Sequence, residues 1–348
     1  MSGKIEKAEA EQWTSKRIGG LLLNNALIIV MLIAIVYIAT QNKNFLTPAS
    51  IINVISLTAA SLPAALGIAG CIVLTGTDLS AGRIIGLTAC IGASLLQVAD
   101  SANKMWPNIG TLPIAVVIVA MMIVGAIFGA FNGFFVAKFK LHPFIVTLGT
   151  QLIVYTLLLL YLKMGNNNGM AISSLAPEYT RFVKGSLFSI AGTPIPNYVF
   201  FAIVLTALMW FIWNKTTFGK NMFALGSNEE AARVSGVNVT LTVVLVFALA
   251  GAMYGITGFI EGARIASNTA NTGANYELDA IAACVIGGVS FTGGVGKVRG
   301  IVLGVFMLRL IFVGLNMMSV DQNLLYLIKG VIILFACALD MRKYLVKK

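Results

Sequence analysis

Charged side chains are scarce in this chain. Only 11% of its 348 residues are Asp, Glu, Lys or Arg, whereas 58% are hydrophobic and the mean hydropathy is +0.90. This scarcity argues against a soluble globular protein. The net charge of +11 is spread over short loops rather than gathered in the basic stripe that nucleic-acid binding requires. A nucleic-acid partner is therefore not expected.

Patterns for metals, redox chemistry and catalysis are also missing. His142 is the only histidine, and the four cysteines lie in apolar stretches without a Cys-x-x-Cys pair. No paired carboxylates and no nucleophile beside a base indicate catalysis. The sequence predicts a protein that is not an enzyme, with no cofactor of its own.

A nucleotide-binding loop is absent as well. The segment GGVGKV at 293–298 comes nearest, but a P-loop needs G-x-x-x-x-G-K-[ST]. Phe291 stands where the first glycine is required, and Val298 supplies no hydroxyl for magnesium. Any ATP chemistry must therefore come from a separate chain.

Long apolar runs are abundant. About 20 apolar residues are needed to cross the ~30 Å of hydrocarbon in a bilayer. We predict an all-α, polytopic transmembrane bundle over residues 21–340, flanked by polar tails at 1–20 and 341–348. About ten spans are expected, at 21–39, 51–74, 83–99, 113–137, 143–162, 198–213, 241–262, 279–291, 300–317 and 323–340.

The distribution of Lys and Arg predicts the orientation. An even number of spans puts both termini on one side. If that side is cytoplasmic, 16 of the 24 basic residues fall in inner segments and six in outer segments, with Arg309 and Lys329 left inside spans. This bias satisfies the positive-inside rule, whereas the opposite orientation violates it. The longest outer segment is then 163–197, and the longest inner segment between spans is 214–240.

The inner segment contains FGKNMFALGSNEEAARVSGVNV (218–239), an unusually charged stretch. Ser227 and Glu230 fit a capping box, and Gly236 is placed to end a helix of about two turns. A helix this short needs packing, either against this chain or against a partner. The residues alone fit an interfacial linker and a docking helix equally well.

This stretch resembles the coupling segment of the membrane permeases of bacterial ABC importers for monosaccharides, the ribose, xylose and galactose group. Four further blocks resemble the same family and extend from the second span to the C-terminus. They are TGTDLSAGR (75–83), PFIVTLGT (143–150), YELDAIAACVIGGVSFTGGVGKVRG (276–300) and IKGVIILFACALD (328–340). TGTDLSAGR and NKTTFGKN are most similar to the galactose/methyl-galactoside permeases, with ribose and xylose as the alternatives.

The resemblance implies a homodimeric pore in the bacterial inner membrane. A periplasmic binding protein would deliver the sugar to it, and a separate ATPase subunit would hold ATP and magnesium. The ATPase would dock on the short helix, and the 163–197 segment would help meet the binding protein. Carried onto this sequence, the docking residues are Ser227, Asn228, Glu229, Glu230, Ala231, Ala232, Arg233 and Gly236.

A few other polar residues are candidates for a gate or pore. Asp78 and Ser80 precede the third span, where they either cap the helix or contribute to a gate. Glu277 and Asp279 begin the eighth span, as a cap or as a transient contact for sugar hydroxyls. Lys329 lies within a span, so we expect it to face protein or a wet cavity rather than lipid.

Two remaining patterns concern packing and a rival function. Gly125, Gly129 and Gly133 follow a Gly-x-x-x-Gly spacing, as do Gly300 and Gly304, which predicts close approach of helices.

An ion-coupled secondary transporter would need paired acids within spans. The acids here cluster at span ends, which disfavours that alternative.

Overall fold

The computed structural model describes residues 26–101, 103–110 and 112–345, so the predicted N-terminal tail lies outside the described residues. Apart from one antiparallel hairpin, β1 (Ser186–Ile190) and β2 (Thr193–Pro196), the elements of the described part are helices. The chain divides into two compact units, one of residues 46–309 and the other formed by the two ends of the chain. The mainly helical class is confirmed.

Six helices of the described part are long and apolar enough to cross a membrane. The other four predicted spans coincide with helices that do not meet this requirement within the described residues, so ten crossings are not confirmed. The six are α4 (Pro48–Val73), α6 (Ile114–Phe139), α7 (Pro143–Leu162), α9 (Asn197–Lys215), α12 (Val239–Ile265) and α14 (Val298–Met317). The four are α3 (Ala26–Gln41), α5 (Ala81–Leu95), α13 (Tyr276–Ile286) and α15 (Gln322–Leu345).

Helix α12 packs closely along α6, as the glycine spacing predicts. A Cβ atom on Gly125 would clash with the carbonyl of Gly251, and one on Gly129 would clash with the carbonyl of Phe247. The two backbones can approach this closely only because Gly125 and Gly129 have no side chain. The predicted packing role of these glycines is confirmed.

Helices α5 and α13 are short and meet inside the larger unit. The loop from α12 to α13 turns back into the protein, because Gly273 lies against Gly82 near the start of α5. Helix α13 ends at Ile286, and its 11 residues span about 16 Å, half of a bilayer core. The eighth span predicted at 279–291 is thus a half-length helix that begins in the interior of the unit.

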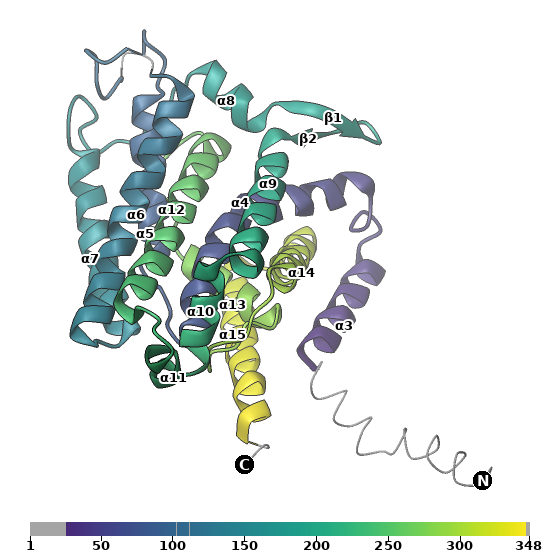
Figure 1. Cartoon of the computed structure of the whole chain (residues 1–348). Helices are drawn as coiled ribbons and strands as arrows, with labels where there is room; N and C mark the ends of the chain where they lie inside the picture. The colour runs from purple at the N-terminus through teal and green to yellow at the C-terminus, as the bar shows by residue number, and fades with distance from the viewer. Residues whose placement is uncertain (1–25, 102, 111, 346–348) are drawn as a thin grey trace, which may run out of the picture. The chain divides into compact units, whose positions relative to one another are not determined.

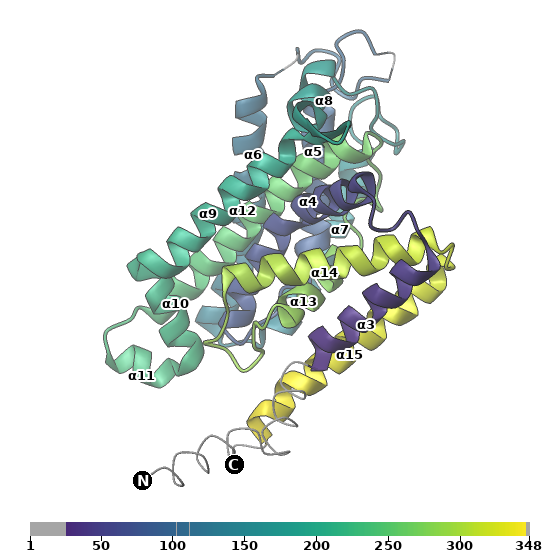
Figure 2. The ribbon, with the colours of Figure 1, turned by 90° about the vertical axis from the view of Figure 1, so that its right-hand side faces the viewer.

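The two ends of the larger unit carry different elements. Figure 1 shows α8 (Pro177–Lys184) and the hairpin at its upper end, while α10 (Thr217–Ser227) and α11 (Glu229–Val234) lie at its lower end. Figure 2 shows α9, α10 and α12 from the side, with α11 at the far end of these helices. The segments predicted at 163–197 and 214–240 therefore lie at opposite ends of the same bundle.

The smaller unit contains α3, α15 and the second part of α14. The side-chain amide of Asn42 donates to the carbonyl of Met317 at 3.0 Å, which ties the end of α3 to α14. Helix α15 runs to Leu345, so the first part of the tail predicted at 341–348 is helical.

Candidate functional site

Helix α11 begins one residue later than predicted. Asn228 is its N-cap in an extended conformation, and its Oδ1 accepts a hydrogen bond from the Ala231 N–H at 2.9 Å. Ser227 is still the last residue of α10, and its hydroxyl donates to the Phe223 carbonyl at 2.8 Å. The capping box predicted at Ser227 is wrong. Ser227 lies in the last turn of α10, and a serine inside a helix donates its hydroxyl to the carbonyl one turn earlier instead of capping the next helix.

The C-terminal end of α11 is as predicted. Gly236 has φ +84°, a left-handed conformation that glycine adopts without a steric penalty. The Val237 N–H reaches back to the Ala232 carbonyl at 3.0 Å and closes the end of the helix. Both ends of α11 are therefore fixed by hydrogen bonds within its own segment.

The surface of α11 combines charge with an exposed apolar side chain. Arg233 pairs with Glu229 at 2.6 Å and approaches Glu230 at 3.6 Å, and all three side chains are exposed. Ala232 is buried, whereas Val234 is 88% exposed. The exposed face of α11 thus carries charges of both signs beside a single apolar side chain.

Beside α11 lies a cleft of about 600 Å³. It brings together the α10–α11 junction, the end of α4, the α6–α7 turn and the first turns of α12. Its lining includes Ser227, Glu230, Leu74, Lys140, His142 and Val243. Helix α11 thus lies next to four separate elements of the bundle.

The α10–α11 junction also contacts the end of α4 directly. A Cβ atom on Gly226 would clash with the carbonyl of Val73, and the Gly294 N–H donates to that same carbonyl at 2.9 Å. Gly293 and Gly294 have positive φ values, so the segment that resembles a P-loop is a tight turn packed against α4 and Ser227. Gly226 and Ser227, the last residues of α10 before α11, therefore contact both α4 and this turn.

A second group of candidate residues forms a buried polar centre around Asp78. Its Oδ1 accepts from the Ser80 N–H at 3.0 Å and from the Ser80 hydroxyl at 2.6 Å. Asn132 of α6 donates to Ser80 Oγ at 2.9 Å, and Thr150 of α7 donates to Asn132 Oδ1 at 2.6 Å. Ser80 makes no side-chain cap of α5, so this chain of hydrogen bonds joins the turn to α6 and α7 instead.

Burial governs the protonation of Asp78, which lies in the turn between α4 and α5. Burial raises the pKa of its carboxyl above the ordinary value, and the hydrogen bonds from Ser80 only partly oppose this. No lysine or arginine forms an ion pair with Asp78 within the described residues. Its carboxyl is therefore suited to holding the turn rather than to presenting a charge.

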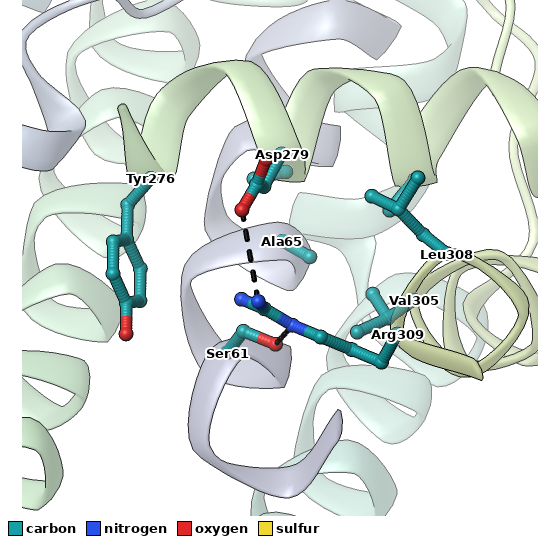
Figure 3. A pocket seen from close by; sticks show the side chains of 9 residues that line it. Ser61, Ala65, Tyr276, Asp279, Val305, Leu308 and Arg309 are labelled. Carbon is teal, nitrogen blue, oxygen red and sulfur yellow. Dashed lines mark hydrogen bonds and ion pairs between the residues drawn. The ribbon is translucent and has the colours of Figure 1, made fainter. Parts of the chain in front are cut away.

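The two acids of α13 have different surroundings. Glu277 is buried against Gly82 of α5. Asp279 pairs with Arg309 of α14 at 3.7 Å, and Arg309 also donates to Ser61 Oγ at 3.3 Å (Figure 3). Their positions in the first turn of α13 agree with the favourable location of carboxylates at a helix N-terminus.

The space beside Arg309 is too small for a sugar. Figure 3 shows the guanidinium between Ser61, Asp279 and the ring of Tyr276, which lies 5.9 Å away. The cavity they line is only about 10 Å³, the size of a single water site. In this conformation the contacts of Arg309 hold α14 against α13 and α4 and leave no room for a sugar.

Lys329 lies in the smaller unit. Its Nζ is 5.4 Å from the ring of Phe312 and 5.4 Å from the ring of Tyr326. Contacts with two aromatic rings reduce the cost of a charge within an apolar helix. The side chain is half-buried, and these contacts join α15 to α14 within this unit.

The sequence analysis did not single out two residues of these sites, Asn132 in the buried polar centre and Val234 on the surface of α11. Asn132 is a polar residue in the middle of an apolar span, and that signal alone identifies it as a buried hydrogen-bonding group. Val234 is apolar within a helix of apolar and charged residues. Its exposure depends on which face of α11 turns inward, and the sequence does not specify that face.

Comparisons with known proteins agree on one family. The family model described as "Branched-chain amino acid transport system / permease component" matches residues 50–337. The galactose/methyl galactoside import permease of Escherichia coli K12 is 45% identical over 94% of this chain and 96% of its own length. The corresponding Haemophilus influenzae permease is 42% identical over 94% and 97%. The ribose import permease of Escherichia coli K12 is 32% identical over 92% and 95%. No solved structure matches the chain.

Proposed function

Since the chain belongs to this family of transport-system permease components, we propose that it is the membrane subunit of an ATP-driven importer of galactose or methyl galactosides. The chain is a multi-pass protein of the inner membrane, and its resemblance to monosaccharide permeases is confirmed. Identity of 45% over nearly the whole chain supports galactose, because identity to the ribose permeases is only 32%. This contrast is the observation that carries the proposal.

The proposed assembly has three further parts. A second copy of the chain would complete the pore, a periplasmic binding protein would deliver the sugar, and an ATPase subunit would dock on α11. The docking role is supported by the exposed charges of α11 and by its place at one end of the bundle (Figure 1), in the longest predicted inner segment. The 16-to-6 distribution of basic residues supports ten spans with both termini in the cytoplasm.

The contacts around α11 suggest how docking would move the bundle. A push on α11 would pass to the end of α10, where Gly226 contacts Val73 of α4 and Ser227 contacts Gly294 of the glycine turn. It would also reach α12, which begins after Asn238, only a few residues beyond α11. Helix α12 packs on α5 and α6, so ATP-driven movement of α11 would be transmitted through α12 to these two helices.

Reconstitution tests this proposal. The chain is placed in liposomes with the ATPase subunit inside and the binding protein outside, and uptake of labelled galactose is measured. We expect uptake only when ATP and both partners are present, with methyl galactoside competing and ribose not competing. Uptake driven by an ion gradient with this chain alone would establish a secondary transporter instead. Preferential competition by ribose would reassign the sugar.

A further inference from the structure

A long apolar groove runs along the outside of the larger unit, between α4, α9 and α14. Its volume is about 790 Å³, and its lining is almost entirely apolar. Leu62, Ala202, Ile203 and Phe306 are among the residues that form it. All three helices are long and apolar enough to span the membrane, so the groove lies at membrane depth.

The length of the groove matches one leaflet. Its lining on α9 extends from Val199 to Trp210, a separation of about 16 Å along the helix. Half of a ~30 Å hydrocarbon core is about 15 Å. An acyl chain from a single leaflet is therefore of a suitable length to lie along it.

Among the described residues, the groove lining contains one charged side chain, at the end where α14 begins. Arg299, at the start of α14, is part of the lining and is exposed. Lys215, at the end of α9, places its Nζ 5.7 Å from the ring of Trp210, which also lines the groove. Neither basic residue takes part in the ion pairs of the described residues, and no acid lines the groove.

This end lies on the α11 side of the molecule, where we propose that the cytoplasm begins. Lys215 lies two residues before the start of α10, and Arg299 follows the glycine turn that contacts Ser227. The positive end of the α14 dipole adds to the two side-chain charges. Tryptophan is enriched where the hydrocarbon core meets the headgroups, which agrees with the position of Trp210.

We propose that this groove is a binding site for an anionic phospholipid of the cytoplasmic leaflet. An acyl chain lies against the apolar lining, and the phosphate binds Arg299 and Lys215. A second copy of the chain is a less suitable occupant. A two-fold related copy would bring another Arg299 and Lys215 to the same end of the groove, which contains no acid to pair with them.

Native mass spectrometry of the detergent-purified full chain tests the site. The chain is titrated with phosphatidylglycerol and with phosphatidylcholine carrying the same acyl chains. We expect phosphatidylglycerol to bind about 30-fold more tightly, the ratio that two basic side chains near a headgroup supply. Arg299→Gln combined with Lys215→Gln should remove most of this preference. Arg181→Gln combined with Lys184→Gln, at the opposite end of the bundle, should preserve it.

Two further measurements separate the lipid from other occupants. Ala207→Trp fills the groove and should weaken the binding of both lipids without changing the oligomeric state in the same spectra. Inorganic phosphate should not displace the lipid, because the acyl chain contributes to binding. Equal affinity for the two lipids, or an unchanged preference in the Arg299/Lys215 variant, would overturn the proposal. Conversion of a dimer to a monomer by Ala207→Trp would assign the groove to the second copy.

Discussion

The segment around α11 and the buried centre around Asp78 both place polar and charged groups in a chain that has few of them. Around α11 the charged groups are exposed, and their ion pairs among the described residues lie within this short helix. Around Asp78 the polar groups are buried and connect the turn before α5 to α6 and α7. Exposed charges leave room for a partner, whereas buried polar groups fix the helices to one another.

This difference predicts that substitutions in the centre reduce stability, while substitutions on α11 reduce transport and leave the fold intact. The glycine contacts between α6 and α12 are a second buried region that fixes helices to one another, because the two backbones touch there. The largest effect on folding is expected at these glycine contacts.

Gly129→Ala should cause the largest loss of folded protein. The new Cβ atom would clash with the Phe247 carbonyl, so α6 and α12 must separate, at a cost of about 1–3 kcal/mol or more. Thermal unfolding in detergent measures the loss. The matched control is Gly149→Ala on α7, where nothing lies within 4 Å, and its stability should be unchanged or slightly higher. Equal stability of the two variants would contradict the role of these glycine contacts.

Asp78→Ala should have the next largest effect. It removes the acceptor for the Ser80 N–H and hydroxyl, and buried groups left without partners cost about 1–3 kcal/mol. Asp78→Asn retains an acceptor oxygen and should lose less, because burial already disfavours the charged carboxylate. Melting temperatures of the two variants in detergent provide the comparison. A wild-type melting temperature for Asp78→Ala would show that the centre does not hold the helices.

Glu230→Lys should leave folding unchanged and impair transport. The side chain is 78% exposed, so its reversal disturbs few internal contacts. We expect ATP-dependent uptake to fall by about tenfold or more, with ATP hydrolysis no longer linked to uptake. Asp100→Lys reverses an exposed charge outside α11 and serves as the control. Normal uptake in Glu230→Lys would remove the coupling assignment.

Arg233→Gln should have only a small effect on stability. Its pairs with Glu229 and Glu230 are exposed, and such pairs contribute about 0.3–0.5 kcal/mol each at most. A melting temperature close to that of the wild-type chain is expected. A large drop would mean that α11 depends on these ion pairs rather than on Asn228 and Gly236.

The sequence predicts the helices and much of the packing because both follow from patterns of apolar and small residues. Gly125 and Gly129 lie at the helix contact that their spacing predicts, and Gly236 ends α11 as expected. The start of α11 was missed because Ser227 and Asn228 are adjacent and both are common N-cap residues. Their roles depend on how far α10 extends, which tertiary packing decides.

The position of α13 could not be predicted for a different reason. The apolar residues at 279–291 predict a span, but the preceding loop turns back into the bundle and brings Gly273 against Gly82. A contact between residues this far apart leaves no periodic signal in the sequence. The same applies to Arg309, which belongs to no recognisable motif but lies 3.7 Å from Asp279.

The docking role of α11 is tested most directly by chemical labelling at Val234, the bare valine of this helix. Val234→Cys is reacted with a maleimide in membranes, with and without the ATPase subunit, and Leu187→Cys in the hairpin at the opposite end is the control. We predict that the ATPase subunit protects Val234→Cys from labelling and leaves Leu187→Cys reactive. Equal labelling of Val234→Cys with and without the ATPase subunit would contradict docking at α11.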